Sequence, residues 1–143
     1  MGKGKIYVRI GQATNLQDGK ENYIKVGGKT MTLDGTEDTH FGQTEVAPSD
    51  ADNHNFNKEF VFNFETAMFS SEKIFFYIMD DDRFSSDDEE GDCEFEYDDK
   101  EQFPPGQEVK LDIHFDVANR IEEMMGKKDT DLEVFVKVDW EEE

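Results

Sequence analysis

The chain has 143 residues, of which 36% are charged and 35% hydrophobic, and it carries a net charge of −21. Nucleic-acid binding needs a positive face, so we expect no nucleic-acid partner. The length suits one domain, which we expect to span residues 1–143 with a core at about residues 5–140. The 13 phenylalanines supply the apolar area that such a core requires.

Cysteine content and hydropathy bear on the compartment. Cys93 is the one cysteine, which excludes an intramolecular disulfide. The sequence contains no evident signal peptide and no apolar stretch of membrane-spanning length. We therefore expect a cytoplasmic protein whose contact with membranes, if any, is peripheral and reversible.

Alternating apolar residues predict an almost entirely β chain. The predicted strands cover residues 5–13, 22–27, 43–46, 56–65, 73–79, 92–97, 109–115 and 132–140. Turn signals at Gly27-Gly28 and Asp34-Gly35 indicate a hairpin with an extended loop over residues 27–42. A short helix is expected at residues 117–125, ended by Gly126 and followed by the last strand. About eight strands at this spacing are typical of a β-sandwich.

An acidic segment follows the apolar run at residues 73–79. Residues 80–91 (Asp-Asp-Asp-Arg-Phe-Ser-Ser-Asp-Asp-Glu-Glu-Gly) hold seven carboxylates in twelve positions. Asp80 and Asp82 share a side of an extended chain, and the loop after them can return to bring in Asp88. Dense oxygen ligands suit Ca²⁺. The alternative is a solvated acidic loop that binds nothing.

An EF-hand does not fit this segment. Its fifth ligand position would be Phe84, no glycine stands at its sixth position, and the flanking residues are predicted strands rather than helices.

Three motifs in order resemble the C2 domain, the second conserved region of protein kinase C. Ala13 and Leu16 match the alanine and leucine that lead into the family's first acidic loop. Residues 22–24 loosely match "Asp-Pro-Tyr-Val". Seven residues match the family's "Asn-Pro-x-Trp-Asn-Glu-x-Phe" and "Asp-x-Asp" patterns. These are Asn53, Phe56, Asn57, Phe60, Asp80, Asp82 and Asp88, with Gly91 closing the last motif. The resemblance covers residues 5 to about 140.

The resemblance implies an eight-stranded antiparallel β-sandwich of the C2-like Greek-key type, with the type II strand order. It also implies a Ca²⁺-binding cup built from three loops at one end. The implied ligands are Asp18, Asn22, Asp80, Asp81 (through its carbonyl), Asp82 and Asp88. Asn22 stands where the family usually has an aspartate, so one to three weakly bound ions are expected.

The leading functional hypothesis is a module that docks to anionic phospholipid membranes when Ca²⁺ is bound. The resemblance places Arg83 and Phe84 at the tip of the third loop, as candidate membrane contacts. The alternatives are that Phe84 caps the sandwich and that Arg83 pairs with a neighbouring carboxylate. A second hypothesis is a protein-interaction or scaffold module with a basic partner, with or without Ca²⁺. No nucleophile–base pair or phosphate loop stands out, so we do not expect an enzyme.

Overall fold

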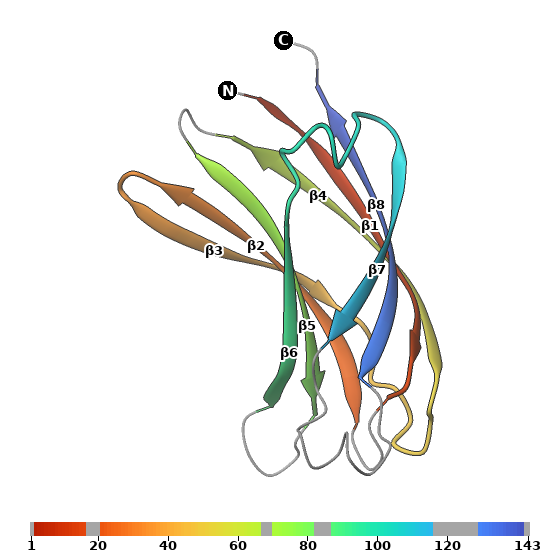
Figure 1. Ribbon diagram of the computed structural model, residues 1–143. Coiled ribbons are helices and arrows are strands. Elements are labelled where there is room, and N and C mark those ends of the chain that lie inside the picture. Colours follow the sequence, from red (N-terminus) through yellow and green to blue (C-terminus); the bar gives the residue numbers. More distant parts are fainter. Residues whose placement is uncertain (1, 17–20, 67–69, 82–86, 116–128, 142–143) are drawn as a thin grey trace.

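A computed structural model of the chain describes residues 2–16, 21–66, 70–81, 87–115 and 129–141 (Figure 1). This part of the chain contains eight strands. They are β1 (Lys3–Thr14), β2 (Asn22–Thr32), β3 (Gly35–Gln43), β4 (His54–Glu65), β5 (Ser71–Asp80), β6 (Asp88–Glu96), β7 (Glu108–Phe115) and β8 (Thr130–Trp140).

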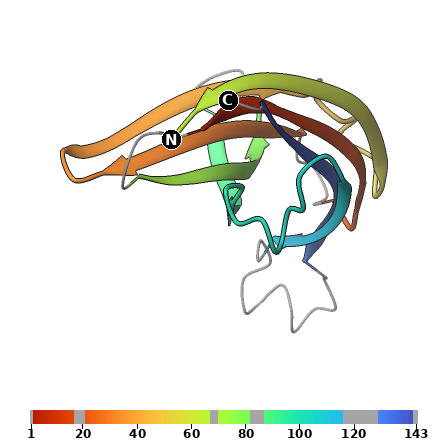
Figure 2. The same cartoon turned by 90° about the horizontal axis from the view of Figure 1, so that it is seen from above.

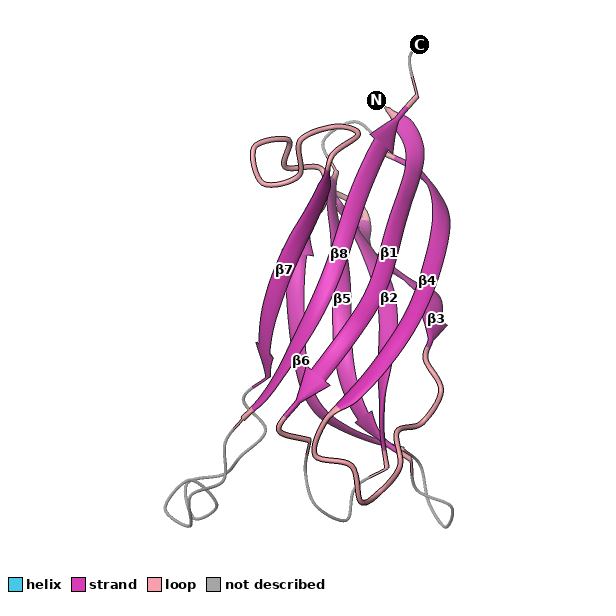
Figure 3. Cartoon of the chain, turned by 90° about the vertical axis from the view of Figure 1, so that its right-hand side faces the viewer, coloured by secondary structure: helices cyan, strands magenta, loops and turns pink. Residues whose placement is uncertain are grey.

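The strands form two four-stranded antiparallel sheets that pack as a sandwich. Sheet A has the order β4-β1-β8-β7 and faces the viewer in Figure 3. Sheet B has the order β3-β2-β5-β6 and lies behind it. The first and last strands are neighbours in sheet A, where Val8 lies opposite Val136. The prediction of an all-β, eight-stranded antiparallel sandwich is therefore confirmed.

Alternation along the strands explains the core. Ile6, Val8 and Ile10 of β1 point inward and are fully buried, whereas Tyr7 and Arg9 between them are only half-buried. The same period places alternate residues of β8 in the core. In β5, Ile74, Phe76 and Ile78 are fully buried and Tyr77 is half-buried, so this strand alternates as well, with Phe75 at 8% exposure as the exception.

The hairpin between the second and third strands differs from the prediction. Residues 27–42 are mostly paired strand rather than an extended loop, and residues 44–46 lie outside any strand. The turn is confined to Leu33 and Asp34, and Gly35 follows it with φ of 140°, which favours glycine. The tip of the hairpin projects beyond the sandwich and has no apolar alternation (Figure 2), so the pattern predicted β2 only as far as Gly27 and did not predict β3.

Two further differences concern the acidic segment and the helix. β6 begins at Asp88, four residues before the predicted start, because its polar residues continue the main-chain pairing with β5. The helix predicted at residues 117–125 lies outside the described residues. Among the described residues, no helix is long and apolar enough to cross a membrane.

The ends of the strands define two poles of the sandwich. β1 ends, β2 begins, β5 ends and β6 begins at one pole, which we call the loop pole (Figure 1). The two chain termini lie at the opposite pole. The described ends of the acidic segment, Asp80 and Asp88, are therefore at the loop pole.

Candidate metal and membrane site

Three acidic or amide residues lie side by side across sheet B at the loop pole. Asn22 at the start of β2 is directly opposite Asp80 at the end of β5. Asp80 is in turn opposite Asp88 at the start of β6. Directly opposed residues in antiparallel strands have Cβ atoms about 5 Å apart. Strand register thus gathers residues that are far apart in the sequence.

Asn22 is held rigidly but keeps one oxygen free among the described residues. It is 1% exposed, and its Nδ2 donates to the carbonyl of Met79 at 3.0 Å. Its own carbonyl accepts a hydrogen bond from the amide of Ala47 at 2.7 Å. The side-chain Oδ1 is buried and has no hydrogen-bond partner in the described part of the chain. A buried acceptor without a partner is costly, and a hard cation beside it would offset that cost.

Asp80 and Asp81 are positioned by the residue before β2. The amide of Glu21 donates to Asp80 Oδ1 at 3.0 Å, and the amide of Asp81 donates to the Glu21 carbonyl at 2.9 Å. The second bond extends the β2–β5 ladder beyond the strand ends, and the first ties the Asp80 side chain to the same segment. They fix the main chain on both sides of the two predicted ligands.

Electrostatics at the loop pole are dominated by carboxylates. Tyr23 donates to Asp87 Oδ2 at 2.6 Å, and burial together with this bond raises the pKa of Tyr23 to about 12. Burial and the neighbouring Asp92 also raise the pKa of Glu89, while Lys25 acts in the opposite direction. The local field therefore disfavours further negative charge.

The segment before β4 ties the first loop to the rest of this pole. The amide of Leu16 donates to the Asp52 carbonyl at 2.8 Å, and Asn53 Oδ1 accepts from the amide of Asn15 at 3.4 Å. Thr130 also donates to the Asn15 carbonyl at 2.9 Å. The end of the first strand is thus held by hydrogen bonds from two other segments, the one before β4 and the start of β8.

Several predicted site residues lie outside the described part of the chain. These are Asp18, Asp82, Arg83 and Phe84, and the side chain of Asp88 belongs with them. Among the side chains that are described, no group of three or more His, Cys, Asp or Glu is arranged to hold a metal. The structure brings together Asn22, Asp80, Asp81 and the main chain of Asp88, and the full ligand set stays a prediction.

Sequence reasoning missed the supporting residues Glu21 and Tyr23, and the bond that joins Tyr23 to Asp87. Their roles depend on strand register, which the sequence does not specify for a polar strand end. For Tyr23 one signal was available, because a tyrosine beside a strand start can hydrogen-bond a carboxylate from an adjacent loop.

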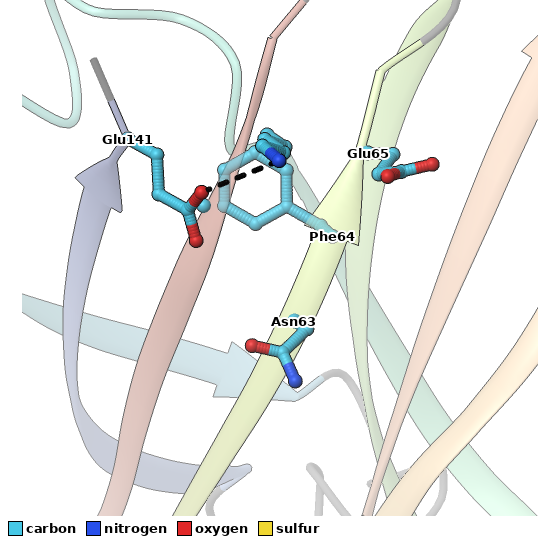
Figure 4. A pocket seen from close by; sticks show the side chains of 6 residues that line it. Asn63, Phe64, Glu65 and Glu141 are labelled. Atoms are coloured by element: carbon cyan, nitrogen blue, oxygen red, sulfur yellow. Dashed lines mark ion pairs between the residues drawn. The ribbon is translucent and has the colours of Figure 1, made fainter. Parts of the chain in front are cut away.

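A cavity lies at the opposite pole, near the chain termini. It has a volume of about 480 Å³ and is lined by Lys3, Gly4, Asn63, Phe64, Glu65 and Glu141 (Figure 4). Lys3 Nζ pairs with Glu141 Oε2 across 3.7 Å. The ends of β1 and β4 build this cavity near the chain termini, far from the acidic strand ends.

Comparison with protein families gives one match. The family model described as "C2 domain" matches residues 4–114, which include the first seven strands almost to the end of β7. The comparison with curated proteins found no match.

Solved structures with a similar fold include two Extended Synaptotagmins and a phospholipase. The C2 domain A of plant Extended Synaptotagmin 1 is 15% identical, with a TM-score of 0.68, covering 100% of this chain and 99% of that one. Human GIVD cytosolic phospholipase A2 is 17% identical, with a TM-score of 0.64, covering 99% of this chain but 16% of the phospholipase. The calcium-bound pair of C2 domains, A and B, of Extended Synaptotagmin 2 gives 13% identity and a TM-score of 0.61, covering 96% of this chain and 46% of that one. At these identities the matches establish the fold.

Proposed function

The chain belongs to the C2 domain family, and from this premise we propose that it is a calcium-binding module that docks to phospholipid membranes when Ca²⁺ is present. We infer that it is a non-catalytic module, since the match to the phospholipase covers only 16% of that enzyme. We also propose the type II strand order, a single domain over residues 1–143, and a cytoplasmic location with reversible membrane association.

The observation that carries this proposal is the row formed by Asn22, Asp80 and Asp88 in adjacent strands. Asn22 Oδ1 supports it, because this buried oxygen has no hydrogen-bond partner among the described residues and Asn22 lies in the same row as two aspartates. Oxygen donors of this kind fit Ca²⁺, which binds six to eight oxygens in a flexible arrangement. The calcium-bound domains of Extended Synaptotagmin 2 are consistent with this choice of ion.

The residues that would hold the ion come from two loops. They are Asp18 and Asn22 from the first, and Asp80, Asp81, Asp82 and Asp88 from the third. Bound Ca²⁺ supplies positive charge and coordination positions that lipid phosphates can share. Without it, the same carboxylates repel both one another and an anionic membrane.

The negative charge that remains after calcium binding limits how tightly such a module binds an anionic membrane. Residues 80–92 hold eight acids and one arginine, a local charge of about −7, which two Ca²⁺ ions reduce to about −3. The docking surface therefore stays negative, and attachment rests on direct bridging and on Phe84 and Arg83 at the tip. We expect weak, strongly calcium-dependent binding.

The test is sedimentation of the protein with phosphatidylserine vesicles and with phosphatidylcholine vesicles, in Ca²⁺ and in chelator. We expect binding only to phosphatidylserine in Ca²⁺, and we expect Asp82→Ala to abolish it. Asp112→Ala, an exposed aspartate on β7 in sheet A, is the matched control and should bind normally. Equal sedimentation in Ca²⁺ and chelator would contradict the proposal.

Calcium binding is measured separately from lipid binding by the melting temperature. A ligand that binds only the folded chain raises the melting temperature by mass action. We expect Ca²⁺ at millimolar concentration to raise it for the wild type and not for Asp82→Ala. No calorimetric heat and no shift in melting temperature at such concentrations would remove the metal from the proposal.

One observation favours a second function. The net charge of −21 makes a basic protein an electrostatically favoured partner, so the chain could serve as a protein-interaction module. Salt-sensitive binding to a defined basic peptide, with no sedimentation on any vesicle, would favour this alternative.

A further inference from the structure

A second cavity lies between the two sheets, along the side of the sandwich where the edge strands β3 and β4 face each other. Its volume is about 170 Å³, far above the 10–15 Å³ or so that one water needs. Its lining residues come from four strands and the residue after β6. They are Gly28, Lys29, Thr30, Glu37, Thr39, Phe41, Asn63, Phe64, Glu65, Glu72 and Tyr97.

Glu72 is the unusual member of this lining. It is 1% exposed, although a carboxylate is rarely buried without a cation. Its Oε2 accepts from Thr30 Oγ1 at 2.6 Å and from the Tyr97 hydroxyl at 3.3 Å, and its Oε1 accepts from Ser70 Oγ at 3.0 Å. These are all hydroxyl donors. The carboxylate is thus held in place by neutral groups, and its charge is not cancelled by them.

No described cation forms an ion pair with Glu72. Lys29 also lines the cavity, but its ammonium is 3.9 Å from Asp38 Oδ1 and 4.7 Å from the centre of the Phe75 ring. Burial and the neighbouring Glu72 carboxylate raise the pKa of Tyr97. Glu37 and Glu65, both exposed, are two further acidic residues at this cavity.

Aromatic rings complete the cavity. Phe64 and Tyr97 are buried and meet edge to face, with ring centres 5.2 Å apart. The Phe41 ring lies against Gly28, where any side chain would overlap it, and stacks on Phe62 at 4.2 Å. Aromatic faces attract organic cations, so the rings favour an organic cation in this cavity.

We propose that the Glu72 cavity binds an organic cation, the ammonium or guanidinium group of a lysine or arginine side chain from a basic protein segment. The buried carboxylate supplies a charge-assisted hydrogen bond, the aromatic rings contact the alkyl stem and the charged head, and Glu37 and Glu65 attract the cation. The acidity of the whole chain favours the same class of partner.

This cavity is distinct from the calcium site. Thr30 lies opposite Glu72 in the β2–β5 ladder, eight positions from the Asn22–Asp80 pair. At about 3.3 Å per residue the two sites are roughly 26 Å apart along the sheet. Cation binding should therefore be the same in Ca²⁺ and in chelator. Its failure would leave the membrane-docking proposal untouched.

The test is a titration of the isotope-labelled protein followed by amide NMR shifts, in chelator. The probes are the N-acetyl amides of arginine and lysine, the neutral N-acetyl amide of norleucine, and the polyamine spermidine. We expect shifts around Thr30, Thr39 and Tyr97 with the cations and none with norleucine. The spermidine arm tells a free polyamine from a protein side chain as the source of the cation, according to which binds more tightly.

Two variants decide the role of the carboxylate. Glu72→Gln should weaken binding by about tenfold or more, because it removes the charge and keeps the size. Glu59→Gln, an exposed glutamate of β4, is the matched control and should bind normally. If Glu72→Gln does not fold, the double variant Glu37→Gln/Glu65→Gln takes its place and should also bind more weakly. Equal binding of norleucine, or wild-type affinity in a folded variant lacking these charges, would overturn the proposal.

Discussion

The hydroxyl of Tyr23 donates a hydrogen bond to Asp87 Oδ2 at 2.6 Å and so joins the start of β2 to the end of the acidic loop before β6. The two residues are 64 positions apart in the sequence. Tyr23 itself is 5% exposed, so the bond anchors a surface carboxylate to a buried ring. It connects the first loop of the candidate site with the third.

Burial of Tyr23, together with this bond, makes stability depend on pH in the alkaline range. The pKa of Tyr23 rises from 10.0 to about 12 in the folded chain, so folding favours the protonated phenol. The stabilisation is complete below pH 10 and is lost as the pH rises through 12. Denaturant unfolding of wild type and Tyr23→Phe across this range should give curves that converge at high pH. Parallel curves would contradict the assignment.

Asn22→Asp should lower the stability of the calcium-free chain and raise its affinity for calcium. The new carboxylate would be buried opposite Asp80, and the hydrogen bond from Nδ2 to Met79 would be lost. Without calcium we expect the free energy of unfolding to fall by about 1–3 kcal/mol, while the added charge tightens calcium binding. Chemical unfolding and calorimetry measure the two effects. Asn63→Asp on β4 is the control, and an unchanged calcium affinity in Asn22→Asp would count against the site.

Gly28→Ala should destabilise the side of the sandwich that holds the Glu72 cavity. A Cβ at this position would overlap with the Phe41 ring and displace it from Phe62. Overpacking of this kind costs about 1–3 kcal/mol. The neighbouring Gly27→Ala, whose Cβ would meet the Thr39 carbonyl at 3.3 Å, should cost less. Thermal unfolding of both variants checks the order, and an equal loss would show that the ring is not the cause.

His114 should titrate above its ordinary range. Its Nδ1 is 2.7 Å from Asp131 and its Nε2 is 3.0 Å from Asp129, and these hydrogen bonds raise the pKa above 6.5. The protonated ring therefore stabilises the fold below pH 6.5, and this contribution is lost as the pH rises through the raised pKa. The ring is exposed, so the effect should be small and should shrink with added salt. NMR titration of the imidazole protons measures it, and a pKa at or below 6.5 would contradict the geometry.

The prediction from sequence was strongest where one face of a strand is buried. Ile6, Val8 and Ile10 alternate with polar residues because one side of β1 packs against the core and the other meets water. A hairpin was predicted at residues 27–42, but the pairing of Lys29 with Asp38 was not. Both faces there are polar or exposed, so main-chain pairing holds the strands together without any apolar period.

Glu72 shows, within one strand, what the sequence pattern predicts and what it does not. Glu72 lies at an even spacing from the inward residues Ile74, Phe76 and Ile78, so alternation alone would place its side chain inside. Composition suggested the opposite, because glutamate is usually exposed. The hydroxyls of Thr30, Ser70 and Tyr97 resolve the conflict, and only the folded chain brings them together.

The sequence by itself determined that this chain is an acidic, all-β sandwich with dense carboxylates after a buried strand, because composition and a two-residue period are local properties. It did not determine which carboxylates meet. That Asn22, Asp80 and Asp88 stand in one row depends on the register of three strands, and that Glu72 faces a cavity depends on how two sheets pack. Register and packing are set by contacts between distant residues, which is why only the tertiary structure decided them.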